Sequence, residues 1–280
     1  MAVSLHWPVP YSRPMNISVA TVWVRGVAAS FADCQHEDSS VTVDAQRAHE
    51  QHMAYVAALK SLIGDVHELP ADDAYPDCVF IEDTAVVIDH ELVVLTHPGA
   101  ETRQGEVLAV RTALEKQLQL RVMEAPACLD GGDVLRIHDR LFIGMSSRSN
   151  PAGADFLATV ARERGLTPVI TSVPMGLHLK SACSLADENT LLVDPAVGLD
   201  VSVFDGLDLE CVKTPEALGA NVLALGGGRL LATASAPESV ELLRSRGLEV
   251  TVLEASEFHK ADGALTCPSL RLPQPGSWCT

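Results

Sequence analysis

The chain has 280 residues, of which 47% are hydrophobic, and its 37 acidic and 20 basic residues give a formal net charge of −17. That hydrophobic share is too high for a disordered chain, and the negative charge disfavours nucleic acid and anionic membranes as partners. Seven cysteines without a CxxC pair argue against a disulfide framework and a thiol zinc site, and favour a reducing, cytoplasmic compartment.

The sequence predicts one large domain between two tails. We expect an irregular tail over 1–15, a single domain over 16–273 and a C-terminal tail over 274–280. The start lacks the basic and apolar regions of a signal peptide, and no apolar run approaches the roughly 18 residues that span a bilayer.

Five segments repeat one pattern, in which two short strands flank a tight polar or glycine-rich turn. The fifth copy is shorter than the others. Helical patterns lie between the copies, and a third strand follows each helical pattern after the first copy. The unit is therefore strand–strand–helix–strand. No clear helix follows 195. The repeats occupy 78–98, 128–148, 177–195, 218–235 and 261–273, and the helical patterns occupy 45–62, 105–118, 151–164 and 236–245.

The repeat spacing predicts a closed ring. Equivalent polar positions recur 43 to 48 residues apart, and a unit of this length cannot bury both faces of its sheet alone. We therefore expect an α/β fold, a five-bladed α/β-propeller around a central channel, with 16–26 adding a strand to the last blade. The first strand of each blade would bring its polar residues into one shared pocket. These residues are Glu82, Asp83, Asp130, Asp133, His178, Lys180, Ser181, Asn221 and Cys267.

A thiol, an imidazole and a carboxylate are among the residues that the ring would gather. A lone buried cysteine is usually structural, and so is a lone core histidine. The repeat register of Cys267 with His178 favours a nucleophile and its acid/base partner instead, with Asp130 of the neighbouring blade fixing the imidazole tautomer. The two glycines after Asp130 equally suit a simple turn or close approach of a ligand.

Acidic and basic residues elsewhere in the repeats suit a cationic amino acid. Asp77, Glu82 and Asp83 flank a strand-like apolar run, either as a solvated strand end or as a clamp for guanidinium. Arg103 and Arg148 follow second strands. Each alone suits a surface arginine, whereas together they would grip an α-carboxylate.

Four motifs in this order and spacing make the chain resemble dimethylarginine dimethylaminohydrolases, members of the guanidino-group-modifying (pentein) superfamily. The motifs are PDCVFIEDTAVV, LDGGDVL, GLHLKS and DGALTC, and the resemblance spans about residues 16–273. It implies the same five-bladed ring. Departures occur at Pro268, where mammalian relatives have a second cysteine, and over 27–43, the expected lid.

The resemblance also implies roles for individual residues. Cys267 would be the nucleophile, His178 the general acid/base and Asp130 its partner. The implied substrate-binding set consists of Asp77, Glu82, Asp83, Ala261 and Asp262 around the guanidinium and amine, Arg103 and Arg148 at the carboxylate, and Phe80 and Ser181 along the pocket wall.

The predicted reaction converts asymmetric dimethylarginine or monomethylarginine to citrulline and an amine through a covalent thiouronium on Cys267. No cofactor or metal is expected, because Cys267 and His178 supply only two zinc ligands. Three alternatives stay open. Arginine deiminases use the same chemistry on unmethylated arginine but resemble longer chains, and agmatine deiminases act on a substrate without a carboxylate, so they need no carboxylate-binding arginines. The third alternative is a non-catalytic ring that binds a partner.

Overall fold

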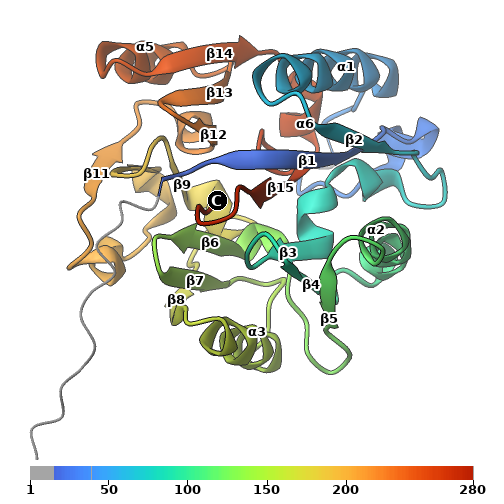
Figure 1. Cartoon of the computed structure of the whole chain (residues 1–280). Helices are drawn as coiled ribbons and strands as arrows, with labels where there is room; N and C mark the ends of the chain where they lie inside the picture. The colour runs from blue at the N-terminus through green and yellow to red at the C-terminus, as the bar shows by residue number, and fades with distance from the viewer. Residues whose placement is uncertain (1–15, 39, 280) are drawn as a thin grey trace, which may run out of the picture.

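Five three-stranded sheets surround a common centre in the computed structural model, which describes residues 16–38 and 40–279 (Figure 1). The tail predicted over 1–15 lies outside the described residues. The first blade along the chain is β3 (Ala85–Val87), β4 (Leu92–Leu95) and β5 (Gln119–Val122), and the second is β6 (Val134–Ile137), β7 (Arg140–Met145) and β8 (Thr167–Ser172). Then come β9 (Cys183–Leu185), β10 (Thr190–Val193) and β11 (Glu210–Lys213), and β12 (Leu223–Gly226), β13 (Arg229–Thr233) and β14 (Glu249–Leu253).

The last blade joins the two ends of the domain. Its strands are β1 (Val19–Arg25), β2 (Val66–Leu69) and β15 (Ser269–Pro273). Strand β1 lies between the other two, antiparallel to β15 and parallel to β2. The predicted closing strand is therefore present, and the ring is held by pairing between segments about 250 residues apart.

Each of the other four blades consists of an antiparallel hairpin with a third, parallel strand at its outer edge. The turns explain how such short hairpins close. Gly226, Gly227 and Gly228 all have positive φ, between 64° and 91°, a conformation that glycine adopts without steric cost. The repeat of strand–strand–helix–strand units in the sequence therefore predicted the fold correctly.

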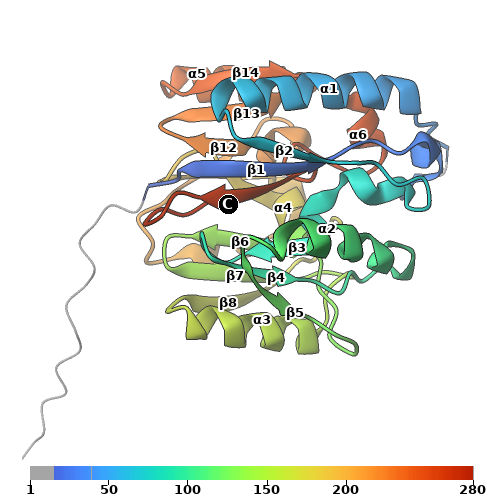
Figure 2. The ribbon, with the colours of Figure 1, turned by 45° about the vertical axis from the view of Figure 1, so that its right-hand side comes forward.

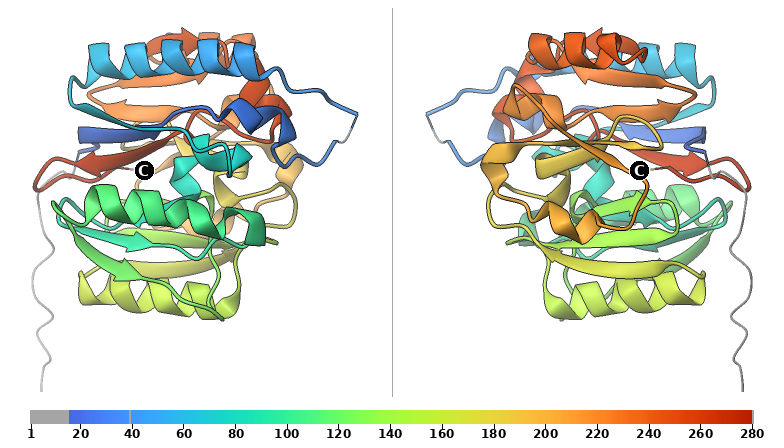
Figure 3. Two further views of the ribbon diagram at one scale, coloured as in Figure 1. Left: turned by 90° about the vertical axis from the view of Figure 1, so that its right-hand side faces the viewer. Right: turned by 90° about the vertical axis from the view of Figure 1, so that its left-hand side faces the viewer.

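The longer helices cover the outside of the sheets, whereas the short α4 lies inside the ring (Figures 2 and 3). Their lengths follow the apolar periodicity of the sequence, and α1 buries Ala48, Tyr55, Val56 and Leu59 along one face. The helices are α1 (Ala45–Leu62), α2 (Val107–Leu114), α3 (Pro151–Glu163), α4 (Leu179–Ala182), α5 (Pro237–Ser245) and α6 (Ser256–Lys260). No helix in the described part of the chain is long and apolar enough to cross a membrane.

The connection after the third repeat has no α-helix, as the weak pattern after 195 indicated. Two 3₁₀ turns, Pro195–Val197 and Val201–Phe204, take its place. Residues 274–279, which we expected to form a tail, lie against the ring. Trp278 is fully buried and bridges to Ile17.

Candidate active site

The polar repeat positions lie in, or directly beside, short helical turns that precede the first strand of each blade. We expected them on the strands themselves, and the hydrogen bonds explain the difference. The Gly132 N–H donates to Asp83 Oδ1 (3.0 Å), and the Leu179 N–H donates to Asp133 Oδ1 (3.0 Å), so each carboxylate satisfies a backbone donor of the next blade. The turns are Ile81–Thr84, Gly131–Asp133, Leu179–Ala182 and Ala217–Ala220, and Cys267 precedes β15 in the same way.

One pocket brings most of the predicted residues together. Its free volume is about 20 Å³, room for little more than a water molecule. We call it the catalytic pocket. It is lined by Gln35, Asp77, Phe80, Asp83, Arg103, Arg148, Leu177, His178, Ala261, Asp262, Gly263 and Cys267.

His178 is held by two buried acids. Its Nε2 lies 3.0 Å from Asp130 Oδ2 and 3.9 Å from Asp83 Oδ1. Asp130 does not line the pocket, because it lies behind the imidazole and its Oδ1 accepts the Gly99 N–H (2.8 Å). The backbone at residue 132 passes so close to the His178 ring that it requires glycine, since a Cβ at that position would lie 2.6 Å from His178 Nδ1.

The charges around the imidazole favour its protonated form. Burial alone would lower the pKa of His178, but the charge of Asp83, then the hydrogen bond and charge of Asp130, outweigh it and raise that pKa to about 9. Burial, with the charges of Glu82 and Asp83, raises the pKa of Cys267 to about 12. At neutral pH the resting site therefore holds a thiol and an imidazolium.

Asp83, Asp130 and His178 also offer three ligand atoms within 4.8 Å of one another, a geometry that a metal ion can use. The same atoms already have protein partners, because Asp83 Oδ2 accepts Arg103 Nη1 at 2.6 Å and Asp130 Oδ2 accepts His178. The cluster is therefore explained by the orientation of the imidazole.

The Arg103 guanidinium donates hydrogen bonds to two carboxylates and a backbone carbonyl. Glu106 contacts its guanidinium with both oxygens (3.0 and 2.9 Å), Asp83 contacts Nη1, and the Phe80 carbonyl accepts Nη2 at 2.9 Å. Arg148 differs, since its Nη2 reaches the Gln35 Oε1 at the pocket mouth (3.2 Å). Of the two predicted carboxylate-binding arginines, Arg148 thus has the freer guanidinium.

Comparison with known proteins decides the family. The chain is 39% identical over 232 residues to the N(G),N(G)-dimethylarginine dimethylaminohydrolase of Streptomyces coelicolor, covering 82% of this chain and 88% of that one. It is 32% identical over 232 residues to the enzyme of that name from Pseudomonas aeruginosa, covering 81% and 89%. This chain belongs to the dimethylarginine dimethylaminohydrolase family.

Solved structures of this family have the same fold. The P. aeruginosa dimethylarginine dimethylaminohydrolase in complex with citrulline superimposes with a TM-score of 0.85 at 28% identity, covering 91% of this chain and 100% of that one. No family model matches the chain. The predicted resemblance and the five-bladed fold are both confirmed.

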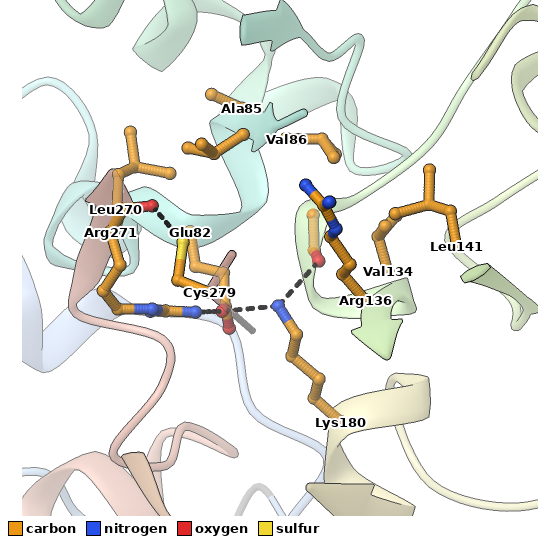
Figure 4. A pocket seen from close by; sticks show the side chains of 12 residues that line it. Glu82, Ala85, Val86, Val134, Arg136, Leu141, Lys180, Leu270, Arg271 and Cys279 are labelled. Atoms are coloured by element: carbon orange, nitrogen blue, oxygen red, sulfur yellow. Dashed lines mark hydrogen bonds and ion pairs between the residues drawn. The ribbon is translucent and has the colours of Figure 1, made fainter. Parts of the chain in front are cut away.

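Two residues of the predicted substrate set lie elsewhere in this family member. Glu82 lines a second cavity that shares no residue with the catalytic pocket (Figure 4). Its Oε1 accepts Lys180 Nζ (2.8 Å) and Arg271 Nη2 (2.5 Å), and its Oε2 accepts the Thr266 hydroxyl (2.8 Å). Adjacent residues of a turn point in different directions, so Glu82 faces the ring centre while Asp83 faces His178.

Ser181 is the other exception. It lies outside the catalytic pocket, and its hydroxyl accepts the His178 N–H at 3.4 Å. It thereby helps to hold the backbone of His178 at the start of α4. The remaining predicted residues, Asp77, Phe80, Ala261 and Asp262, line the pocket.

The sequence analysis missed Gln35, which lines the pocket beside Asp77 and Arg148. Its backbone N–H donates to Asp77 Oδ1 (3.1 Å), its side-chain oxygen accepts Arg148, and its side-chain nitrogen contacts the Thr102 hydroxyl. Gln35 lies in the irregular segment 27–43 and has no counterpart in the repeat. Apart from its polar side chain, nothing in the sequence indicated a place in the site.

Proposed function

We propose that this protein hydrolyses N-ω-methylated arginines to citrulline and methylamine or dimethylamine. The observation that carries the proposal is the catalytic pocket, where the Cys267 thiol, the His178 imidazole and several carboxylates meet. The named activity of the relatives and the citrulline complex of the P. aeruginosa enzyme support it. A cytoplasmic location stays a prediction.

The substrate itself activates the nucleophile in this proposal. The resting thiol is protonated, because its pKa is raised to about 12. A guanidinium that binds against Asp83 and Asp262 places a positive charge beside Sγ and lowers the pKa of Cys267. Cys267 then releases its proton to solvent water, because His178 is already protonated, and attacks the guanidinium carbon as a thiolate.

His178 carries the protons of both half-reactions. As an imidazolium it donates a proton to the substituted nitrogen, the C–N bond breaks, and an amine leaves a thiouronium on Cys267. The neutral imidazole then takes a proton from water, which attacks the same carbon and breaks the C–S bond. Asp130 keeps the ring in one orientation and stabilises its charged form.

The amino-acid end of the substrate would lie at the mouth of the pocket. Asp77 is available to pair with the α-ammonium, and Arg148 with the α-carboxylate, at the positions that Gln35 now occupies. This separation of charges favours an amino acid over a decarboxylated guanidine such as agmatine.

Citrulline assays test the proposal directly. Purified protein is incubated with asymmetric dimethylarginine, monomethylarginine and arginine in parallel, with Cys267→Ser as the matched inactive control. We expect citrulline from the two methylated substrates and none from the serine variant. Citrulline from arginine alone would assign deiminase chemistry instead, and no product from folded protein would support a binding role.

A further inference from the structure

The fourth repeat contributes one buried asparagine, Asn221, and the reaction proposed above gives this residue no part. Asn221 follows the Ala217–Ala220 turn and is 5% exposed. A buried amide is costly unless its donors and its acceptor find partners, whereas an apolar side chain would fill the space without that requirement. The partners of the Asn221 amide therefore indicate what the residue does.

The Asn221 amide bridges the two segments that carry the reacting groups. Its Nδ2 donates to the Lys180 carbonyl (2.9 Å) and to the Thr266 hydroxyl (3.1 Å), and its Oδ1 accepts the Thr266 N–H (3.2 Å). Lys180 lies two residues after His178, and Thr266 directly precedes Cys267. One side chain thus links the turn of the acid/base to the segment of the nucleophile.

These bonds fix the orientation of the amide. With Oδ1 and Nδ2 exchanged, a donor would face the Thr266 N–H and an oxygen would face the Lys180 carbonyl, so only one orientation satisfies both partners. Glu82 also contacts Lys180 and Thr266, but through the ends of their side chains, whereas Asn221 binds the backbone of both. A fully satisfied buried network of this kind specifies one geometry.

The backbone on both sides of Asn221 is held as well. The Ser184 hydroxyl donates to the Ala220 carbonyl (2.7 Å) and accepts the Val222 N–H (2.9 Å), and Ser184 is 2% exposed. Ser184 belongs to β9, the strand that directly follows α4. The blade that carries His178 therefore holds Asn221 through its flanking backbone and through its side chain.

Other contacts hold each reacting residue against a third segment. The Cys267 carbonyl accepts the Glu82 N–H (3.0 Å), and Asp130 orients the His178 ring. These contacts remain when the amide of Asn221 is removed. Its loss should therefore leave both residues in the pocket but change the separation between them.

We propose that Asn221 is a positioning residue that sets the separation between His178 and Cys267. The proposal deepens the function proposed above and rests on it. In the first half-reaction the thiolate forms the C–S bond, and His178 gives its proton to the nitrogen whose C–N bond breaks, so both groups must reach one guanidinium together. A displacement of about 1 Å can lower a rate about 10²-fold, so loss of the bridge should slow proton transfer far more than it weakens substrate binding.

Two leaving groups separate proton transfer from attack. An amine leaves with a proton from His178, whereas the methanethiolate of S-methyl-L-thiocitrulline leaves as an anion and takes its proton from water. In single turnovers we expect Asn221→Ala to slow thiouronium formation from dimethylarginine about 10²-fold, with KM within about twofold, and from S-methyl-L-thiocitrulline less than about fivefold. Mass spectrometry of quenched samples should then show thiouronium accumulating on Cys267 with the second substrate, because its hydrolysis still needs His178.

Gln51→Ala is the matched control. Gln51 is also 5% exposed, its Oε1 accepts the Glu257 N–H (3.0 Å), and its Nε2 donates to the Ser256 hydroxyl (2.8 Å) at the start of α6. A loss of stability alone changes the rates with both substrates by the same factor, which we expect of this variant. Equal losses in Asn221→Ala, or no loss, would overturn the proposal. Asn221→Asp, which keeps the acceptor for the Thr266 N–H but lacks both donors, replaces Asn221→Ala if the latter does not fold.

A measurement without substrate keeps this inference distinct from the proposed function. Iodoacetamide alkylates the Cys267 thiolate with loss of iodide, and a nearby imidazolium raises the thiolate fraction. Mass spectrometry of the Cys267 peptide gives the alkylation rate below pH 9 in wild type, His178→Gln, Asn221→Ala and the double variant. We expect the effect of His178→Gln to shrink in the Asn221→Ala background, a result that supports the proposal even if no methylarginine is turned over. Additive effects overturn it even if methylarginines are turned over.

Discussion

The Nε2 atom of His178 lies 3.0 Å from the Oδ2 atom of Asp130, and both side chains are shielded from water. In this setting the carboxylate does more than orient the ring. Its hydrogen bond and charge, after the charge of Asp83, overcome burial and keep the imidazole protonated to about pH 9. The pair therefore sets the pH range in which the site can donate a proton to a departing amine.

Replacement of Asp130 by asparagine should change the pH profile of the reaction. We expect kcat to fall by about 10² to 10⁴, a range typical of losing acid–base function. In the wild type, kcat/KM should decline as pH rises through about 9, where His178 loses its proton. In Asp130→Asn the decline should begin at lower pH, since a favourable charge is gone. An unshifted alkaline limb would mean that His178 is not the group that titrates.

The same shift predicts how stability depends on pH. The unfolded pKa of histidine is about 6.5 and the folded pKa of His178 is about 9, so the folded state binds more protons between these values. Its stabilising effect is complete below about pH 6.5 and is lost as pH rises towards 9. Urea unfolding should therefore show the wild type losing more free energy of unfolding over this window than His178→Gln. Parallel curves for the two proteins would contradict the assigned shift.

The blade repeat could be predicted from the sequence because it is periodic. Strand pairs, helices and third strands recur every 43 to 48 residues, and an incomplete fifth copy needs a partner strand, which β1 supplies. The direction of individual side chains could not be predicted in this way. Glu82 and Asp83 are adjacent carboxylates, and only the position of Lys180, 98 residues away from Glu82, determines which of them faces the ring centre.

The positions of residues in irregular segments were harder to predict than those in the blades. Gln35 belongs to a connection without strand or helix periodicity, so nothing in the pattern placed it near Asp77 or Arg148. The residues next to Gln35 in the sequence could not be aligned with the repeat, so they did not predict where Gln35 lies relative to the blades. The contact that closes the pocket is tertiary, and it becomes visible only when the ring brings three separate segments together.

Gln35 should affect substrate binding more than chemistry. We expect Gln35→Ala to lower KM for dimethylarginine about five- to tenfold, because the substrate carboxylate no longer has to displace the hydrogen bond from Arg148 to Gln35, with kcat within about twofold. Ser40→Ala is the matched control, because among the described residues the Ser40 hydroxyl bonds only to Asp38 of the same segment. An arginine analogue without the α-carboxylate should bind both proteins equally. A large loss of kcat in Gln35→Ala would instead assign Gln35 to the reaction itself.

Glu82 should support the fold rather than the substrate. Glu82→Gln leaves the buried charges of Lys180 and Arg271 without their carboxylate, and removing one partner of such a cluster costs about 3–5 kcal/mol. Thermal unfolding should show a clear drop in Tm, which Glu82→Gln combined with Lys180→Met partly restores. KM for dimethylarginine should change less than about twofold in the folded variant, because the carboxylate lies outside the catalytic pocket. An unchanged Tm together with a markedly raised KM would return Glu82 to the substrate-binding set.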